Sequence, residues 1–230
     1  TSSGDYDVPK RILNEQGVQA FLSHTQNFKG REGVLIINLK SPVPSSSVEN
    51  LTYSFISNAV FRKKHRLIFQ RASQRNGINI FSSYDEDGTT YFGLLGRTSN
   101  QIKFATNLLN KFASFDFTER DLTNAVKALR DSFDSISEQG LSAQLNYYAA
   151  TATKQGPFLY SKKEISAALD KASLEGLTKF YQEYLNSIYV DIFSHGIEKP
   201  DKIIKFAKDV REILGQTSQF DRWRLVDDFK

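Results

Sequence analysis

The feature that most constrains this chain is a nearly unbroken run of branched apolar residues, Gly33-Val-Leu-Ile-Ile-Asn-Leu-Lys40. Such a run is typical of a β-strand that is covered on both faces, or on one face and an edge. Pro42 and Pro44 end the strand, because proline cannot donate to a ladder of backbone hydrogen bonds. The serines at 45–47, followed by Glu49, then offer a helix N-cap. The chain is therefore expected to build a sheet and to pack helices on it.

A long helix is predicted directly after this strand, over residues 48–74. Asn76-Gly77 ends it, since glycine readily adopts the left-handed conformation at a helix C-terminus. Its apolar residues recur at helical spacing, and they are Leu51, Phe55, Ile56, Ala59, Val60, Leu67, Ile68 and Ala72.

The remaining pattern alternates between strands and helices. Further strands are predicted over 18–24, 78–84, 89–95 and 188–194. Turns are predicted at 27–30 and 85–88, and the Asp87-Gly88 pair in the second turn is a strong hairpin signal. Helices are predicted over 99–112, 119–136, 141–155 and 202–214, and two shorter helices begin at Ser161 and Ser173.

This order predicts an α+β fold. We expect a two-layer sandwich, with a mixed or antiparallel β-sheet and helices packed on one face. Residues 1–214 are predicted to form a single domain. The polar stretch 215–230 is predicted to be a linker toward a following domain that is absent from this sequence.

Composition excludes several classes of protein. Hydrophobic residues make up 40% and charged residues 24% of the 230 residues, which are globular values. No apolar run approaches the roughly 18 residues of a membrane span. The absence of cysteine excludes disulfides, Cys-ligated zinc and thiol catalysis. The net charge of +4 does not by itself indicate nucleic-acid binding, so we expect neither a membrane nor nucleic acid as a partner.

The sequence shows no catalytic motif. It holds three histidines, His24, His65 and His195, and no two are spaced to share one metal ion on a helix. Neither a Gly-x-Ser-x-Gly elbow nor a phosphate-binding loop is present. We therefore predict no catalytic residue, no metal ligand and no cofactor site in this segment.

One cluster of charge is unusual. Residues 62–75 contain Arg62, Lys63, Lys64, His65, Arg66, Arg71 and Arg75, with no acidic residue among them. Two interpretations stay open: a solvated helix face, or a face turned toward phosphate or an acidic partner. A one-signed helix lacks the i, i+4 ion pairs that stabilise exposed helices. The candidate contacts to a partner or substrate are therefore Arg62, Lys63, Lys64, Arg66, Arg71 and Arg75.

Several short strings, in their order and spacing, resemble the insulysin/pitrilysin metallopeptidases, or inverzincins. They are Leu39-Lys-Ser-Pro42, the hairpin at 77–96, Phe115-Asp-Phe-Thr-Glu-Arg-Asp121, Asn124-Ala-Val126, Lys163-Glu-Ile-Ser-Ala-Ala-Leu169, Leu177-Thr-Lys-Phe-Tyr181 and Ser194-His-Gly196. The resemblance spans residues 8–214. It is closest to the third of the four homologous α+β domains in full-length members, and it implies that this chain is a segment of a longer peptidase.

The resemblance allows the family's zinc site to be tested position by position. Active domains carry His-x-x-Glu-His, in which two histidines bind zinc and the glutamate activates water, and a further glutamate ligand follows. With Asn124-Ala-Val126 as the anchor, that ligand falls at Leu129 and a neighbouring family glutamate falls at Leu122. The His-x-x-Glu-His window falls near residues 48–52, where no histidine stands. The resemblance thus implies zinc in the catalytic domain of the parent protein and none in this segment.

The leading interpretation is a non-catalytic structural domain from the C-terminal half of an insulysin/pitrilysin-like zinc metalloendopeptidase. Such a domain helps to enclose peptide substrates in a clamshell chamber, so the expected partners are the other domains of the parent and the enclosed peptide. The alternatives are a core-type non-peptidase subunit of the same superfamily and a nucleic-acid-binding module that uses the basic helix. The resemblance implies a periplasmic location in a Gram-negative bacterium and a cytosolic or organellar one otherwise.

Overall fold

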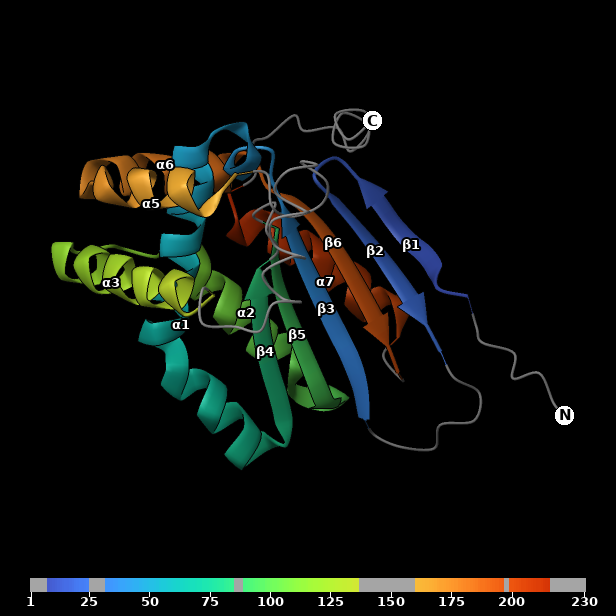
Figure 1. Ribbon diagram of the computed structural model, residues 1–230. Coiled ribbons are helices and arrows are strands. Elements are labelled where there is room, and N and C mark those ends of the chain that lie inside the picture. Colours follow the sequence, from blue (N-terminus) through green and yellow to red (C-terminus); the bar gives the residue numbers. More distant parts are fainter. Residues whose placement is uncertain (1–7, 25–31, 85–88, 137–159, 197–198, 216–230) are drawn as a thin grey trace, which may run out of the picture.

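The computed structural model describes residues 8–24, 32–84, 89–136, 160–196 and 199–215 (Figure 1). Six strands form one open sheet in the order β1-β2-β6-β3-β5-β4. Among these strands β2 and β6 pair in parallel, and the other neighbours pair antiparallel, which confirms the predicted mixed sheet. The strands are β1 (Lys10–Glu15), β2 (Val18–Ser23), β3 (Glu32–Lys40), β4 (Ile78–Tyr84), β5 (Thr90–Arg97) and β6 (Tyr189–His195).

The helices form the second layer. Figure 1 shows α7 lying across the sheet, and α1, α3, α5 and α6 grouped toward the β4 side. In the part of the chain that the structure describes, no helix is both long and apolar enough to cross a bilayer. The helices are α1 (Val48–Asn76), α2 (Thr98–Ala113), α3 (Glu119–Ile136), α5 (Lys162–Asp170), α6 (Leu174–Asn186) and α7 (Pro200–Ile213), with a 3₁₀ turn at Pro44–Ser46.

The ends of α1 follow from local chemistry. The Ser47 side chain accepts a hydrogen bond from the backbone N–H of Asn50 (3.1 Å), which satisfies one of the free donors of the first turn. Gly77 ends the helix with φ = 61°, and its N–H bonds to the carbonyl of Ala72. The predicted helix is therefore confirmed to within two residues at its C-terminal end.

The sheet has one covered face, as predicted. Along β3, Leu35, Ile37 and Leu39 are at most 1% exposed, whereas Val34 and Ile36 on the opposite face are partly exposed. Alternation of this kind arises because successive side chains of a strand point to opposite faces. The side chains buried between the sheet and the helices include Val18, Ala20, Leu22, Phe61, Phe92, Leu94, Ala105, Leu108, Phe112, Phe206 and Val210.

Two features differ from the sequence analysis. Strand β1, Lys-Arg-Ile-Leu-Asn-Glu, was not expected, because it is polar and forms only by pairing with β2. Leu67 was assigned to the apolar stripe of the long helix, but its side chain is 55% exposed. The predicted turns at 27–30 and 85–88, the helix at 141–155 and almost all of the linker at 215–230 lie outside the described residues. The division into one domain and a linker stays a prediction.

One close contact in the helical layer yields a first prediction. A Cβ placed on Gly176 of α6 would lie 2.1 Å from the hydroxyl oxygen of Tyr53, which accepts a hydrogen bond from the backbone N–H of Ser173 (3.2 Å). Gly176→Ala should therefore lower the free energy of unfolding by about 1–3 kcal/mol, although alanine favours helix formation. The measurement is urea unfolding of both proteins.

The same contact supplies the control. Tyr53→Phe removes the hydroxyl group, so Gly176→Ala should cost less in that background than in the wild-type chain. A Gly176→Ala variant that is more stable than wild type would contradict the packing of Tyr53 on α6.

Candidate functional site

The structure brings together the window at 48–52, in which the resemblance locates His-x-x-Glu-His, and the two positions, Leu122 and Leu129, at which it locates family glutamates. Leu51 lies in the first turn and a half of α1, within the window at 48–52, and Leu122 and Leu129 lie on α3. All three belong to one buried cluster and are 1%, 6% and 8% exposed. The other buried members are Phe55, Ile56, Val60, Ala125, Ile165, Leu169 and Leu177, from α1, α3, α5 and α6.

This cluster has no means of holding a cation. Its members are apolar, and metal ions in proteins take carboxylate, imidazole, thiolate or carbonyl ligands. Among the described residues, no group of three or more His, Asp or Glu side chains is arranged to hold a metal ion. The leucines pack α3 and α5 onto α1.

The histidines do not converge on one site. His24 and His195 lie at the ends of the neighbouring strands β2 and β6, and each bonds across to the other strand. The Nδ1 atom of His24 is 2.7 Å from the carbonyl oxygen of Gly196, and the Nδ1 atom of His195 is 3.1 Å from the Ser23 hydroxyl. His65 lies on α1, away from these two strands, and its ring packs against the ring of Phe61.

The leucine cluster yields a second prediction. Leu129→Glu restores the acidic residue of the family's zinc site but buries a carboxylate among apolar side chains. We expect the variant to lose about 3 kcal/mol or more of unfolding free energy at neutral pH. The loss should shrink in acid, because burial raises the pKa of a carboxyl group and the neutral form is tolerated better. Thermal and urea unfolding at two pH values measure both effects.

Asn124→Glu is the matched control, since Asn124 is exposed on the same helix. It should leave stability nearly unchanged. If Leu129→Glu behaves like Asn124→Glu, the side chain of Leu129 is not buried and the assignment of the ligand position is wrong.

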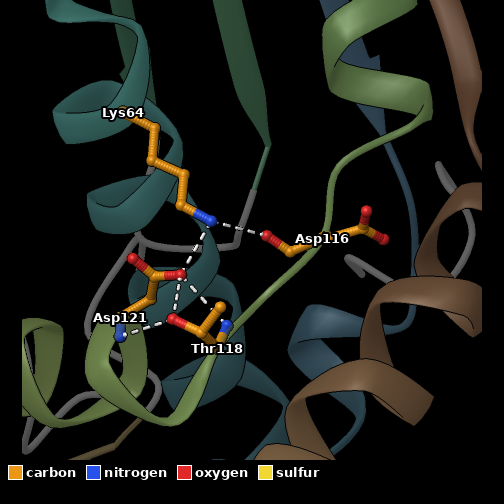
Figure 2. A network of polar contacts seen from close by, with 4 residues as sticks. All are labelled: Lys64, Asp116, Thr118 and Asp121. Carbon is orange, nitrogen blue, oxygen red and sulfur yellow. Dashed lines mark hydrogen bonds and ion pairs between the residues drawn. The ribbon is translucent and has the colours of Figure 1, made fainter.

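The basic residues of α1 separate into two groups, and Lys64 is the exception among them. Its ammonium group lies 2.7 Å from a carboxylate oxygen of Asp121. It also donates to the backbone carbonyl of Asp116 (2.8 Å) and lies 5.1 Å from the centre of the Phe115 ring. Figure 2 shows Lys64 reaching from α1 to the segment that enters α3. Lys64 is thus engaged within the fold.

Asp121, which pairs with Lys64, also belongs to the N-terminal cap of α3. The Thr118 hydroxyl accepts from the N–H of Asp121 (3.2 Å), and Asp121 in turn accepts from the N–H of Thr118 (3.0 Å), which is a capping box (Figure 2). Burial alone would raise the pKa of Asp121, but hydrogen bonds from Lys64 and Thr118 outweigh it and hold that pKa below its usual value. The helix over 119–136 was predicted from the local sequence, whereas the pairing of Asp121 with Lys64 has no local sequence signal.

The other basic side chains point into solvent. Arg62, Lys63, Arg66 and Arg71 are all exposed, and we call these four residues the cationic face. Lys63 and Arg71 each lie about one turn from Leu67, on the same side of the helix, because residues four apart are neighbours on a helix surface. Arg75 lies in the last turn of α1, and its side chain lies outside the described part.

His65 lies beside this face but is not part of it. Its ring is 4.6 Å from the ring of Phe61 and 5.6 Å from that of Phe115, centre to centre. Its Nε2 atom is buried and has no hydrogen-bond partner among the residues that the structure describes. Burial, and then the positive charges of Lys111 and Lys64, lower the pKa of His65 below its ordinary value. The folded protein therefore favours the neutral form of this imidazole.

This environment yields a third prediction. The unfolded chain binds a proton at His65 near pH 6.5, but the folded protein binds it only at lower pH. Because the unfolded state then holds more protons, the free energy of unfolding should fall as the pH drops below about 6.5. His65→Leu should remove this part of the pH dependence, as measured by urea unfolding across a pH series.

His24→Leu is the comparison for this series, because His24 contacts the end of β6 and not the aromatic cluster. The free energy of unfolding of His24→Leu should still fall as the pH drops, as it does for the wild-type chain. Parallel profiles for wild type and His65→Leu would contradict the account of His65.

Comparison with solved structures identifies the fold. The structure resembles the crystal structure of pitrilysin with a TM-score of 0.83 at 17% sequence identity, over 95% of this chain and 23% of that chain. It also resembles a conserved protein from Enterococcus faecalis V583, with a TM-score of 0.62 at 14% identity, over 94% of this chain and 55% of that one. No protein-family sequence model matches this chain, and no curated protein matches it by sequence.

At these identities the similarity establishes the fold, which is that of a pitrilysin domain. The chain spans 23% of the length of pitrilysin. The six-stranded mixed sheet of this chain, with helices packed on it in a fold similar to that of a pitrilysin domain, confirms the predicted fold class.

Proposed function

We propose that this chain is a non-catalytic structural domain of an insulinase-like zinc peptidase and that it helps to enclose peptide substrates. The observation that carries the proposal is the leucine cluster. In a chain with a fold similar to that of a pitrilysin domain, Leu129 stands where the resemblance locates the glutamate ligand, and it packs with Leu122 and with Leu51 of the window at 48–52. Apolar side chains at these positions stabilise the packing of the helices, and they cannot bind the metal ion that would activate water.

The proposal has a direct requirement. This chain spans 23% of the length of pitrilysin, and we propose that it has no zinc site of its own. The zinc site must therefore lie in another domain of the same protein. The complete reading frame should therefore encode a His-x-x-Glu-His motif in another domain. A complete frame without that motif would overturn the peptidase role and would favour a core-type subunit of the superfamily.

The cationic face is the proposed contact surface of this domain. Arg62, Lys63, Arg66 and Arg71 are exposed, and no acidic residue lies between positions 62 and 75 to balance them. Four cations on neighbouring helix turns produce a field that attracts an acidic surface. We propose that this surface belongs to a facing domain of the parent peptidase or to the peptide that it encloses. Lys64 is excluded from the contact, because its charge is already paired with Asp121.

The fourth prediction tests this surface in the complete parent protein. Reversing three charges, Arg62→Glu, Lys63→Glu and Arg66→Glu, should lower peptide turnover about fivefold or more at low salt. The difference from wild type should narrow as salt screens the field. Turnover is measured across a series of ionic strengths.

The control carries the same change of net charge at scattered exposed positions: Lys103→Glu, Lys127→Glu and Lys179→Glu. It should leave turnover and its salt dependence close to wild type. If both triple variants behave alike, the cationic face is only a solvated surface. Tight, steeply salt-dependent binding of RNA or DNA by the chain would instead favour the nucleic-acid module.

A further inference from the structure

The two edge strands of the sheet differ in how they are protected against pairing with another strand. Strand β1 carries three charged residues, Lys10, Arg11 and Glu15, and its register with β2 shifts between Arg11 and Leu13. Glu15 is also held by two cations of α7, Lys208 at 3.3 Å and Arg211 at 3.9 Å. Charges and bulges of this kind are the devices by which proteins keep an edge strand from recruiting a partner.

Strand β4, the opposite edge, has none of these devices. Its sequence, Ile-Asn-Ile-Phe-Ser-Ser-Tyr, contains no charge and no proline. Its register with β5 is regular over all seven residues, and the side chain of Phe81 at its centre is 49% exposed. Asn79 and Ser83, on the same face, are exposed as well. A regular, uncharged edge with an exposed aromatic residue is a template for a further strand.

The hydrogen-bonding direction of β4 follows from its junction with β5. The N–H of Arg97 bonds to the carbonyl of Gly77 (3.4 Å), which makes this pair a hydrogen-bonded one. Bonded and non-bonded pairs alternate along an antiparallel ladder. Residues 79, 81 and 83 therefore direct their backbone groups toward β5. Ile80 and Ser82 direct theirs toward the free edge, since β4 is the last strand of the described sheet.

We propose that β4 pairs with β4 of a second copy of this chain, antiparallel and centred on Phe81. In that register Ile80 lies opposite Ser82 of the second copy, and the outward backbone groups of the two residues meet. Asn79 lies opposite Ser83 on the uncovered face. Like charges opposite each other would oppose the pairing of two identical strands. Strand β4 carries no charge, so this repulsion does not arise. The two sheets then continue as one.

Phe81 occupies the centre of this pairing. Opposed residues that do not exchange hydrogen bonds approach closest in an antiparallel ladder, about 4.5 Å between Cα atoms, and the two Phe81 residues form such a pair. The ring of Phe81 is held over Gly93, where a Cβ would lie 1.9 Å from the ring. Aromatic pairs across strands stabilise sheets, so the half-exposed ring gains a partner in the second copy.

Cysteine crosslinking tests the register, because the chain has no cysteine of its own. Phe81→Cys places two thiols about 4.5 Å apart between Cα atoms, within the range for a disulfide. Ser83→Cys is the matched control: it is exposed on the same face, but the two thiols would lie about 13 Å apart along the paired strands. Under mild oxidation, Phe81→Cys should form a disulfide-linked dimer and Ser83→Cys should remain a monomer.

Sedimentation equilibrium tests the association itself in the unmodified chain. One strand pair is a small interface, so dimer should appear at concentrations of about 0.05–1 mM. Phe81→Lys should remove the dimer, because two like charges would then lie opposite each other. Leu95→Lys, exposed to a similar extent on the neighbouring strand, should retain it.

Hydrogen exchange provides an internal control within one molecule. The amides of Ile80 and Ser82 should exchange more slowly as protein concentration rises, whereas the amides of β1 should not change. A chain that stays monomeric throughout this concentration range would overturn the proposal. Equal crosslinking at residues 81 and 83 would overturn it too.

Discussion

The packing of Phe61 joins the two layers of this protein, and the remaining structure depends on it. This residue of α1 is 1% exposed, and its ring lies 5.8 Å from Phe92 of β5 and 5.3 Å from Phe112 of α2. A buried aromatic group of this size contributes several kcal/mol when its surroundings are complete. Because it fixes the middle of α1 on the sheet, it determines what each half of the helix does. The first half packs against α3, α5 and α6, and the second half presents the cationic face.

The sequence analysis was accurate where the signal is local. The cap at Ser47, the stop at Gly77 and the start of a helix at Ser161 depend on residues only a few positions apart, and they were predicted. Contacts between distant segments were not. Strand β1 forms only because β2 lies beside it, and the ion pair of Lys64 joins residues 57 positions apart in the sequence. The sequence positions of Lys64 and Asp121 do not indicate that the two side chains form an ion pair.

The candidate site shows the same division. The resemblance placed Leu122 and Leu129 at two glutamate positions of the family, and the structure shows that both are buried on α3. Their packing against Leu51 of α1 depends on the tertiary fold, and only the resemblance to the peptidase family indicated it beforehand. The basic cluster could not be divided from sequence, because only the fold shows that Lys64 is paired while Arg62, Lys63, Arg66 and Arg71 remain exposed. The free edge at β4 likewise depends on strand order, which the sequence pattern does not provide.

The central claim is that this chain contributes structure and contact surface and does not carry out metal chemistry. Its most direct test is metal analysis of the purified chain after exposure to zinc and dialysis, with peptide cleavage assayed on the same sample. The account predicts zinc well below one equivalent and no cleavage that a chelator suppresses, because Leu129 stands at the glutamate ligand position and no histidine stands in the window at 48–52. One equivalent of retained zinc together with chelator-sensitive cleavage would contradict it.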